Sequence, residues 1–191
     1  MKYISLDLET TCLVPNPNHI LMFSFVLEDT DHPEIHVDNL PHCTGFVQYP
    51  NITGSAYALS MNSWILDILS GRSKVTSPYY IFSPEDFEKA TRRFMYEAFD
   101  GRSATVAGKN VASFDIPFLP QSIQILFKHR VMDIGMACMD LVRDQKVPDL
   151  AECKRRCGIN TPVAHDARED ALDVIRCFRV LRARAFAERR V

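Results

Sequence analysis

The sequence predicts an α/β fold, with a mixed β-sheet flanked by helices, and it predicts one domain over residues 1–191. Patterns typical of strands dominate the first 50 residues, and patterns typical of helices then alternate with short strand patterns. A chain of 191 residues with 47% hydrophobic residues can bury one good core. No repeat, low-complexity segment or linker divides it.

The first half of the expected sheet is an antiparallel meander. Lys2–Leu8 is apolar enough for a buried strand, and Ile20–Glu28 is predicted as the second strand, after a Pro-Asn-Pro-Asn turn at 15–18. Glu34–Val37 and Gly45–Tyr49 are expected to complete the meander. The chain therefore begins with strands that pair with their sequence neighbours.

Helices dominate the rest of the chain. Ala56–Leu69 has apolar residues at helical spacing, and a further helix is expected where Ser83 caps a segment with Pro84 at its first position and Asp86 in its first turn. The remaining expected elements are a strand at Ala104–Ala107, a helix from about Phe114, a strand ending at Arg130–Met132 and a last helix over 167–189.

Composition limits the class of protein. No apolar run is long enough to span a membrane and no signal peptide is evident, so we expect a cytoplasmic protein without a membrane partner. Its six cysteines are expected to be reduced thiols. Net charge is −2, with 8 basic and 14 acidic residues up to position 120 and 14 basic and 10 acidic residues after it. This slightly acidic charge does not exclude a nucleic-acid substrate, because a protein that binds only a chain end can attract its phosphates partly through bound metal ions.

Four carboxylates and one histidine stand where strands end or helices begin: Asp7, Glu9, Asp115, His165 and Asp170. Carboxylates brought together repel one another unless hard cations such as Mg²⁺ or Mn²⁺ neutralise them. A histidine beside such a centre is suited to act as a general base near neutral pH. Together these residues predict metal-dependent hydrolysis of a phosphodiester.

The first two of these carboxylates are predicted to share a face of the sheet. Side chains alternate along a strand, so Asp7 and Glu9 point to one face while Leu6 and Leu8 point into the core on the other. Two acidic side chains on an otherwise apolar strand are costly to bury without a cation.

The histidine and the last carboxylate are predicted to flank the start of the final helix. Asp166 followed by Glu169 resembles a capping box, which would begin the helix at Ala167. His165 would then lie in the preceding loop and Asp170 in the first helical turn. Both side chains could face one site.

Three segments, SLDLETT at 5–11, GKNVASFDIPFL at 108–119 and AHDAREDA at 164–171, resemble the exonuclease motifs of the DEDD superfamily, in its DEDDh branch. That branch includes ribonuclease T, oligoribonuclease, polymerase proofreading subunits and small phage or bacterial enzymes. The resemblance implies a ribonuclease-H-like fold, a mixed five-stranded sheet flanked by helices, and 3′–5′ exonuclease chemistry with two Mg²⁺ or Mn²⁺ ions. Cys12 replaces the glycine common after the Thr-Thr pair, and the spacing from Asn110 to Phe114 fits many proofreading subunits less well.

The resemblance also implies a role for each residue. Asp7 would bridge both metals, Glu9 and Asp170 would complete one metal site, and Asp115 would hold the second metal. His165 would deprotonate the attacking water, and the product would be a nucleoside 5′-monophosphate.

The expected partner is a single-stranded 3′ end, with DNA slightly favoured over RNA. Thr10 and Thr11 are candidates for contacts to the terminal sugar, and residues 54–62 resemble a segment that lies near the terminal base in small phage-type members, with Met61 and Asn62 as candidates. The alternatives are an exoribonuclease or oligoribonuclease, or a non-catalytic module that binds nucleic-acid ends or a polymerase. Homodimer formation and polymerase association are left open.

Overall fold

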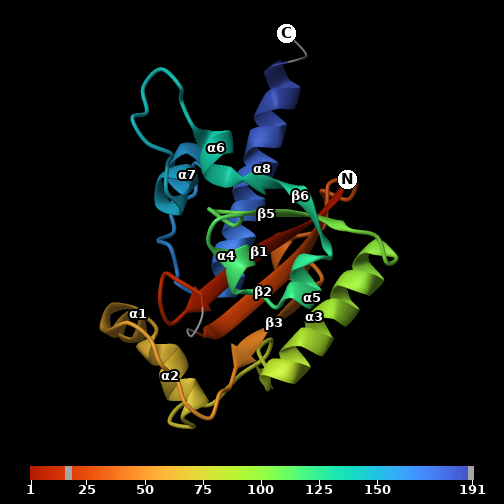
Figure 1. Cartoon of the computed structure of the whole chain (residues 1–191). Coiled ribbons are helices and arrows are strands. Elements are labelled where there is room, and N and C mark those ends of the chain that lie inside the picture. Colours follow the sequence, from red (N-terminus) through yellow and green to blue (C-terminus); the bar gives the residue numbers. More distant parts are fainter. Residues whose placement is uncertain (16–18, 189–191) are drawn as a thin grey trace.

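A central strand, β1 (Lys2–Thr10), organises the sheet in the computed structural model, which describes residues 1–15 and 19–188. The strand order is β4-β3-β2-β1-β5-β6. β1 pairs antiparallel with β2 (Ile20–Asp29) and parallel with β5 (Ala104–Gly108) (Figure 1). The sheet is therefore mixed, as predicted. Because β1, β5 and β6 (Phe127–Asp133) run parallel, their carboxyl ends lie at the same end of the sheet.

Two strand predictions need correction. The described sheet has six strands rather than five, because β4 (Ile81–Phe82) adds two residues beside β3 (His42–Val47). The strand predicted at Glu34–Val37 is wrong: Val37–Asn39 is a 3-10 helix, and the His36 side chain accepts a hydrogen bond from the backbone N–H of Asp38. Such local side-chain bonds compete with strand pairing. Most of the predicted turn at 15–18 lies outside the described residues.

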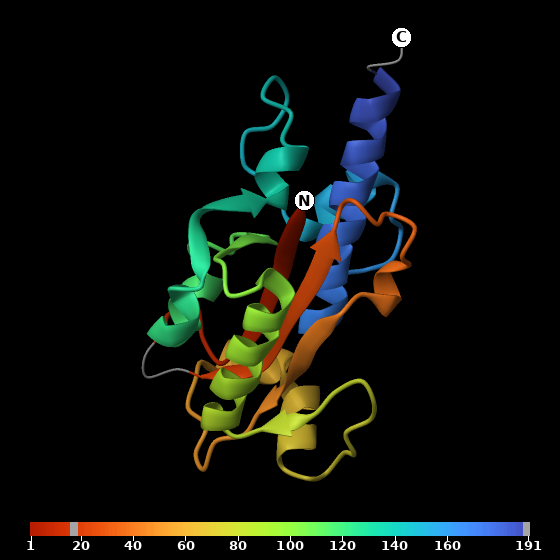
Figure 2. The same cartoon turned by 90° about the vertical axis from the view of Figure 1, so that its right-hand side faces the viewer.

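Two layers of helices cover the sheet (Figures 1 and 2). On one face, α3 (Pro84–Phe99) packs through Phe87, Met95 and Phe99, and the Ser83 hydroxyl caps it as predicted. On the other face, α8 (Ala167–Glu188) packs against β1 and β2. Its start agrees with the prediction, whereas the predicted end at residue 189 lies outside the described residues.

The helix predicted at Ala56–Leu69 is two helices, α1 (Ala56–Met61) and α2 (Ser63–Leu69), with Asn62 between them. The remaining elements are short and lie along the sheet edge or beside α8: α4 (Asp115–Phe118), α5 (Gln121–Gln124), β6 (Phe127–Asp133), α6 (Ile134–Cys138) and α7 (Leu150–Cys157). Sequence patterns did not predict α5, α6 or α7, which span only four, five and eight residues, too few for a helical repeat to be recognised.

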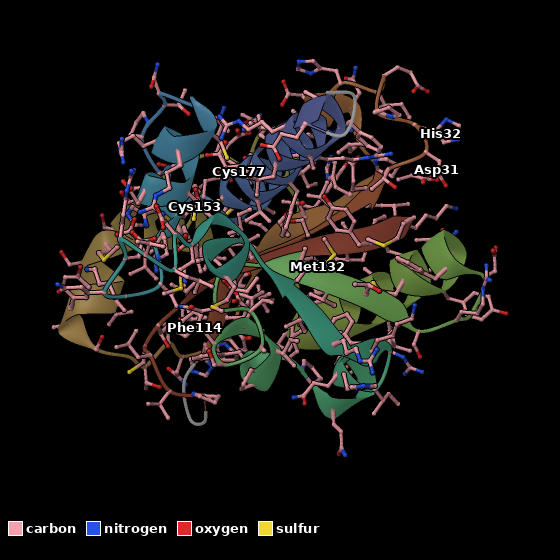
Figure 3. The ribbon with its side chains drawn as sticks, turned by 90° about the horizontal axis from the view of Figure 1, so that it is seen from above. Asp31, His32, Phe114, Met132, Cys153 and Cys177 are labelled. Carbon is pink, nitrogen blue, oxygen red and sulfur yellow. The ribbon has the colours of Figure 1, made fainter. Side chains whose placement is uncertain are left out.

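The buried cysteines lie where α7 packs on α8. Cys153 and Cys177, both fully buried, are labelled in Figure 3. All six cysteines are free thiols, as expected. In the part of the chain that the structure describes, every helix is too short or too polar to cross a membrane.

Candidate active site

The end of β1 brings two carboxylates to the face of the sheet that α8 covers. Leu6 and Leu8 belong to the core beneath α3, so Asp7 and Glu9 lie on the opposite face, as their spacing predicted. On that face the Ser5 hydroxyl donates a 2.8 Å hydrogen bond to the carbonyl of Ala171. The first turns of α8 are thereby held directly against the carboxylates.

Asp115 comes close to these two carboxylates from the loop that follows the carboxyl end of β5. Gly108 ends β5, and a Cβ there would lie 2.8 Å from the carbonyl oxygen of Leu6, so only glycine permits this close approach to β1. Asn110 then turns the chain with a φ of 57°, and α4 begins at Asp115, directly after Phe114 (Figure 3). The buried Asp115 carboxylate accepts a 3.0 Å bond from the Leu8 N–H.

Asp133, at the end of β6, fixes this turn. Its carboxylate accepts a 2.6 Å bond from the N–H of Asn110 and a 3.0 Å bond from the N–H of Met136. One side chain therefore caps α6 and holds the loop that carries Asp115. The link crosses 23 residues, which the sequence alone could not indicate.

His165 and Asp170 flank the start of α8, as predicted. Asp166 caps the helix by accepting bonds of 2.9 and 3.1 Å from the N–H groups of Arg168 and Glu169. The capping box is incomplete, because the Glu169 carboxylate instead pairs with arginine side chains. His165 is exposed, and its φ of 50° is unusual for a residue other than glycine. The Asp170 carboxylate is buried.

Sequence reasoning missed Tyr79, which supports this loop. Its hydroxyl donates a 2.9 Å bond to Asp166, and its ring packs 5.6 Å from that of Phe46, centroid to centroid. Tyr79 is 87 positions from Asp166 and belongs to none of the three motifs. No local signal could have identified it.

A buried ion pair behind the loop was also missed. Lys154 of α7 and Asp173 of α8 are 1% and 3% exposed and contact each other directly. The Lys154 ammonium also donates a 2.8 Å bond to the carbonyl of Pro162, in the loop that leads to His165. The pair thus ties α7, α8 and the histidine loop together. A lysine between two cysteines on a short helix gives no indication of such a partner.

These segments bring the five predicted residues to one location. Ligand atoms of Glu9, His165 and Asp170 all lie within 4.8 Å of one another. Asp7 and Asp115 lie close enough to this group for their charges to act on one another. Carboxylate oxygens are the donors that suit Mg²⁺ or Mn²⁺. The residues present therefore fit the predicted metal ions.

Electrostatics at Asp7 and Asp115 reflect this crowding. Burial raises the pKa of Asp7 well above its ordinary value, and the negative charges of Asp115, Glu9 and Asp170 raise it further. Burial also raises the pKa of Asp115, although hydrogen bonds from backbone N–H groups oppose that shift. Burial and neighbouring negative charge both disfavour the charged form of a carboxylate, so each of these shifts has the direction expected of a crowded acidic site.

The other two carboxylates are less strongly perturbed. Burial and then the charge of Asp170 raise the pKa of Glu9 to about 7, against a hydrogen bond from the Asn62 side chain. Burial raises the pKa of Asp170 to about 6, opposed by the N–H of Ala164, which donates a 3.2 Å bond, and by the charge of His165. Both groups change protonation state near neutral pH when no metal is bound.

The four residues predicted to bind substrate come from the end of β1 and from the end of α1. Thr10 and Thr11 are buried, and their hydroxyls bond within the local turn, to the carbonyl of Cys12 and from the N–H of His19. Asn62 is buried and donates a 3.1 Å bond to the carbonyl of Thr10, whereas Met61 is 36% exposed. Segment 54–62 therefore docks on the end of β1, and the substrate contacts stay predictions.

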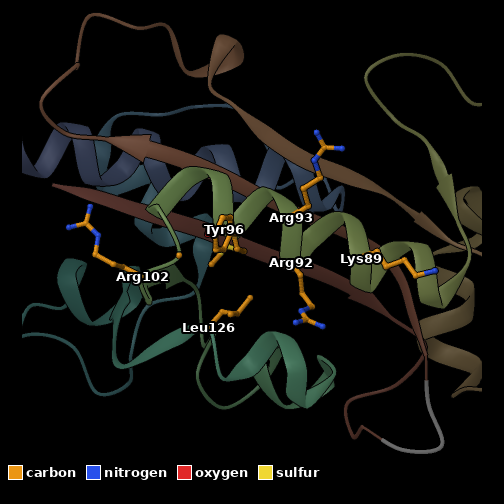
Figure 4. Close-up of a pocket in the computed structure, with 8 residues that line it drawn as sticks. Lys89, Arg92, Arg93, Tyr96, Arg102 and Leu126 are labelled. Carbon is orange, nitrogen blue, oxygen red and sulfur yellow. The ribbon is translucent and has the colours of Figure 1, made fainter.

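A surface cavity of about 380 Å³ lies along α3, away from these residues (Figure 4). Four cations line it: Lys89, Arg92, Arg93 and Arg102. Each pairs with an exposed carboxylate at 2.7–3.9 Å, so the surface has little unbalanced charge to attract phosphates. The cavity along α3 is therefore not a second candidate for the active site.

Neither a protein-family model nor a curated protein sequence matches this chain. Solved structures of nucleases do match its fold. They include the Pan2 catalytic unit of Neurospora crassa, with its protease and nuclease domain (15% identity, TM-score 0.62), and E. coli Exonuclease I in complex with a dT13 oligonucleotide (14% identity, TM-score 0.64). S. pombe Pop2p in its Mg²⁺- and Mn²⁺-bound form also matches (15% identity, TM-score 0.61).

The matches cover 98%, 98% and 96% of this chain, but only 28%, 43% and 84% of those three structures. The chain therefore shares the fold of these nucleases, and its mixed sheet flanked by helices agrees with the ribonuclease-H-like fold that the motifs predicted. At 15% identity or less, the likeness establishes the fold, and the activity is argued from the site.

Titration of Glu9 should make the metal-free protein less stable as pH rises. Folding raises the pKa of Glu9 from 4.5 to about 7, so the folded state binds more protons between these values. The unfolding free energy should fall as pH rises through this window, by at most about 1.4 kcal/mol per pH unit for one group. Urea denaturation in EDTA from pH 5 to 8 measures the slope, which Glu9→Gln should reduce. Parallel profiles for the two proteins would contradict this assignment.

Breaking the buried ion pair should destabilise the protein. Lys154→Met leaves Asp173 buried with only its Arg176 contact, at 2.7 Å, and should cost about 3 kcal/mol of unfolding free energy in urea denaturation. Arg93→Met removes an exposed pair with Glu97 and should change stability little. Equal effects of the two substitutions would show that burial of the Lys154 pair has no energetic weight.

Proposed function

We propose that residues 1–191 form one 3′–5′ exonuclease domain that hydrolyses phosphodiesters at single-stranded 3′ ends. The observation that carries this proposal is the convergence of Asp7, Glu9, Asp115, His165 and Asp170, from three distant segments, at the end of β1 in a fold shared with nucleases. Buried carboxylates with raised pKa values beside a histidine are typical of catalytic sites.

The carboxylates would hold two Mg²⁺ or Mn²⁺ ions. Glu9 and Asp170 would complete one site and Asp115 the other, with Asp7 shared between them. When bound, such ions stabilise negative charge on the attacking and leaving oxygens of a phosphoryl displacement. The Leu8 and Ala164 N–H groups, which donate to Asp115 and Asp170, orient these two carboxylates.

His165 would act as the general base. Its ring is exposed, so an attacking water can reach it, and it lies at a left-handed turn that Asp166 and Tyr79 hold. A ring nitrogen would take the proton from the water, and nearby Glu9 and Asp170 would stabilise the resulting imidazolium. The product would be a nucleoside 5′-monophosphate.

The proposed substrate is a single-stranded 3′ end rather than a duplex. The structure of Exonuclease I with dT13 is a fold relative that binds a single-stranded oligonucleotide, and on that basis we propose DNA ahead of RNA. Thr10, Thr11, Met61 and Asn62 are proposed to contact the terminal nucleotide. Cytoplasmic location stays a prediction, and homodimer formation and polymerase association stay open alternatives.

Degradation of 5′-labelled single-stranded DNA and RNA oligomers of matched sequence, with Mg²⁺ or Mn²⁺, tests the proposal. We expect stepwise shortening from the 3′ end with release of monophosphates. Asp7→Ala should nearly abolish turnover, and His165→Ala should lower kcat by about 10²–10⁴. The exposed Asn51→Ala variant is the control and should retain full activity. Cleavage of a circular single strand, or a folded Asp7→Ala variant with more than about a tenth of wild-type activity, would contradict the proposal.

A further inference from the structure

The outer edge of the sheet carries a bulge with two cations and a histidine between them. β6 is the edge strand (Figure 1), and the register between β5 and β6 shifts near its start. Three residues of β6, Lys128, His129 and Arg130, stand there opposite the single residue Thr105 of β5. Extra residues in a strand redirect side chains from the regular pleat. All three side chains of the bulge are exposed.

The charges of this bulge are not neutralised. Within the described residues, the side chains of Lys128 and Arg130 form neither an ion pair nor a hydrogen bond, and the exposed Lys2 is likewise unpaired. No Asp or Glu lies between Asp115 and Asp133 in the sequence. The cations of the α3 cavity differ, because each of them pairs with a carboxylate. Unpaired cations gathered at one surface attract anions.

A surface cavity of about 410 Å³ lies beside the bulge. Lys2, Lys128 and Arg102 line it, together with the hydroxyl residues Ser103 and Thr105. The Arg102 guanidinium already pairs with a neighbouring carboxylate, so the two lysines supply the unbalanced charge. Lysine, serine and threonine side chains are common donors to phosphate oxygens in complexes with nucleic acids. The donors around this cavity therefore suit a phosphate group.

β6 connects this surface with the candidate active site. The strand ends at Asp133, whose carboxylate holds the loop that carries Asp115. Lys128 lies five positions before Asp133, which corresponds to at most roughly 17 Å along an extended strand. That span is longer than one nucleotide. A nucleic-acid strand whose 3′ end lies among the carboxylates can therefore reach the bulge only with phosphates nearer its 5′ end.

We propose that Lys128 and Arg130 bind phosphates of the single strand on the 5′ side of its terminal nucleotide, an inference that rests on the proposed exonuclease function. Lys2 and the hydroxyls of Ser103 and Thr105 provide further donors around the cavity. Phosphate contacts of this kind position a strand without reading its sequence. Longer strands then bind more tightly than short ones, because only longer strands reach from the acidic site to these cations.

Two oligomers of different length separate this surface from the active site. A fluorescein-labelled oligo(dT) trinucleotide and labelled dT13 are titrated with protein in Ca²⁺ buffer at several KCl concentrations, and fluorescence anisotropy gives each Kd. Each phosphate contact with a single strand adds about 0.7 to the slope of log Kd against log salt concentration. The double variant Lys128→Gln with Arg130→Gln should therefore lower the slope for dT13 by about 1.4. Its Kd for the trinucleotide should equal that of the wild type.

Control variants test whether charge at these positions is what matters. Lys128→Arg with Arg130→Lys keeps both charges and should keep the wild-type slope. Arg93→Gln removes an exposed cation that pairs with Glu97, and it should also leave the slope unchanged. Thermal melts check that each variant is folded. If the double glutamine variant is unfolded, Lys128→Gln alone serves and should lower the slope by about 0.7.

Three results would overturn the inference. The first is an unchanged slope for dT13 in a folded glutamine variant, and the second is an equal loss of affinity for the trinucleotide, which would indicate long-range attraction without contact. The third is binding to phosphatidylserine vesicles that requires Lys128 and Arg130 while dT13 binding is unaffected, which would assign the surface to a membrane. If the slope falls as expected but Mg²⁺ and Mn²⁺ support no degradation, the exonuclease proposal fails and the strand-binding surface stands.

Discussion

Repulsion among four carboxylates at the end of β1 is the constraint around which this structure is built. Burial raises the pKa values of all four carboxylates, and neighbouring negative charges raise them further. The four groups are Asp7, Glu9, Asp115 and Asp170. Nothing in a polypeptide would gather these groups for stability alone, because burying unpaired charge is costly. Their convergence is therefore best explained by a ligand of opposite charge, which the oxygen-rich donor set also favours.

Residues outside the three motifs hold the loops of the site in place against this repulsion. Each charged loop has an anchor elsewhere in the chain: Asp133 holds the turn before Asp115, Tyr79 holds the cap next to His165, and Lys154 holds the loop that leads to it. In each of these hydrogen bonds one partner is charged, which makes the bond stronger than one between neutral groups. The geometry of the site thus depends on contacts that a motif search would not consider.

Local chemistry made much of this arrangement predictable from sequence. Alternation along β1 placed Asp7 and Glu9 on one face, and the Asp166 cap located the start of α8. Long-range pairing was not predictable: the partners Tyr79–Asp166 and Lys154–Asp173 carry no joint signal in the chain. The continuous helix expected at Ala56–Leu69 is interrupted at Asn62 because the Asn62 side chain bonds to β1, a tertiary contact that overrides helical periodicity.

The central claim is that a cation binds among these carboxylates, and thermal melts of wild type and Asp7→Asn, each with EDTA and with millimolar Mn²⁺, test it most directly. In EDTA the variant should be at least as stable as wild type, because it removes one repelling group. Mn²⁺ at 100 times its Kd should stabilise the wild type by about 2.7 kcal/mol and the variant by much less. Equal Mn²⁺-induced shifts in the two proteins would mean that the cation binds elsewhere, and the four-carboxylate site would be wrong.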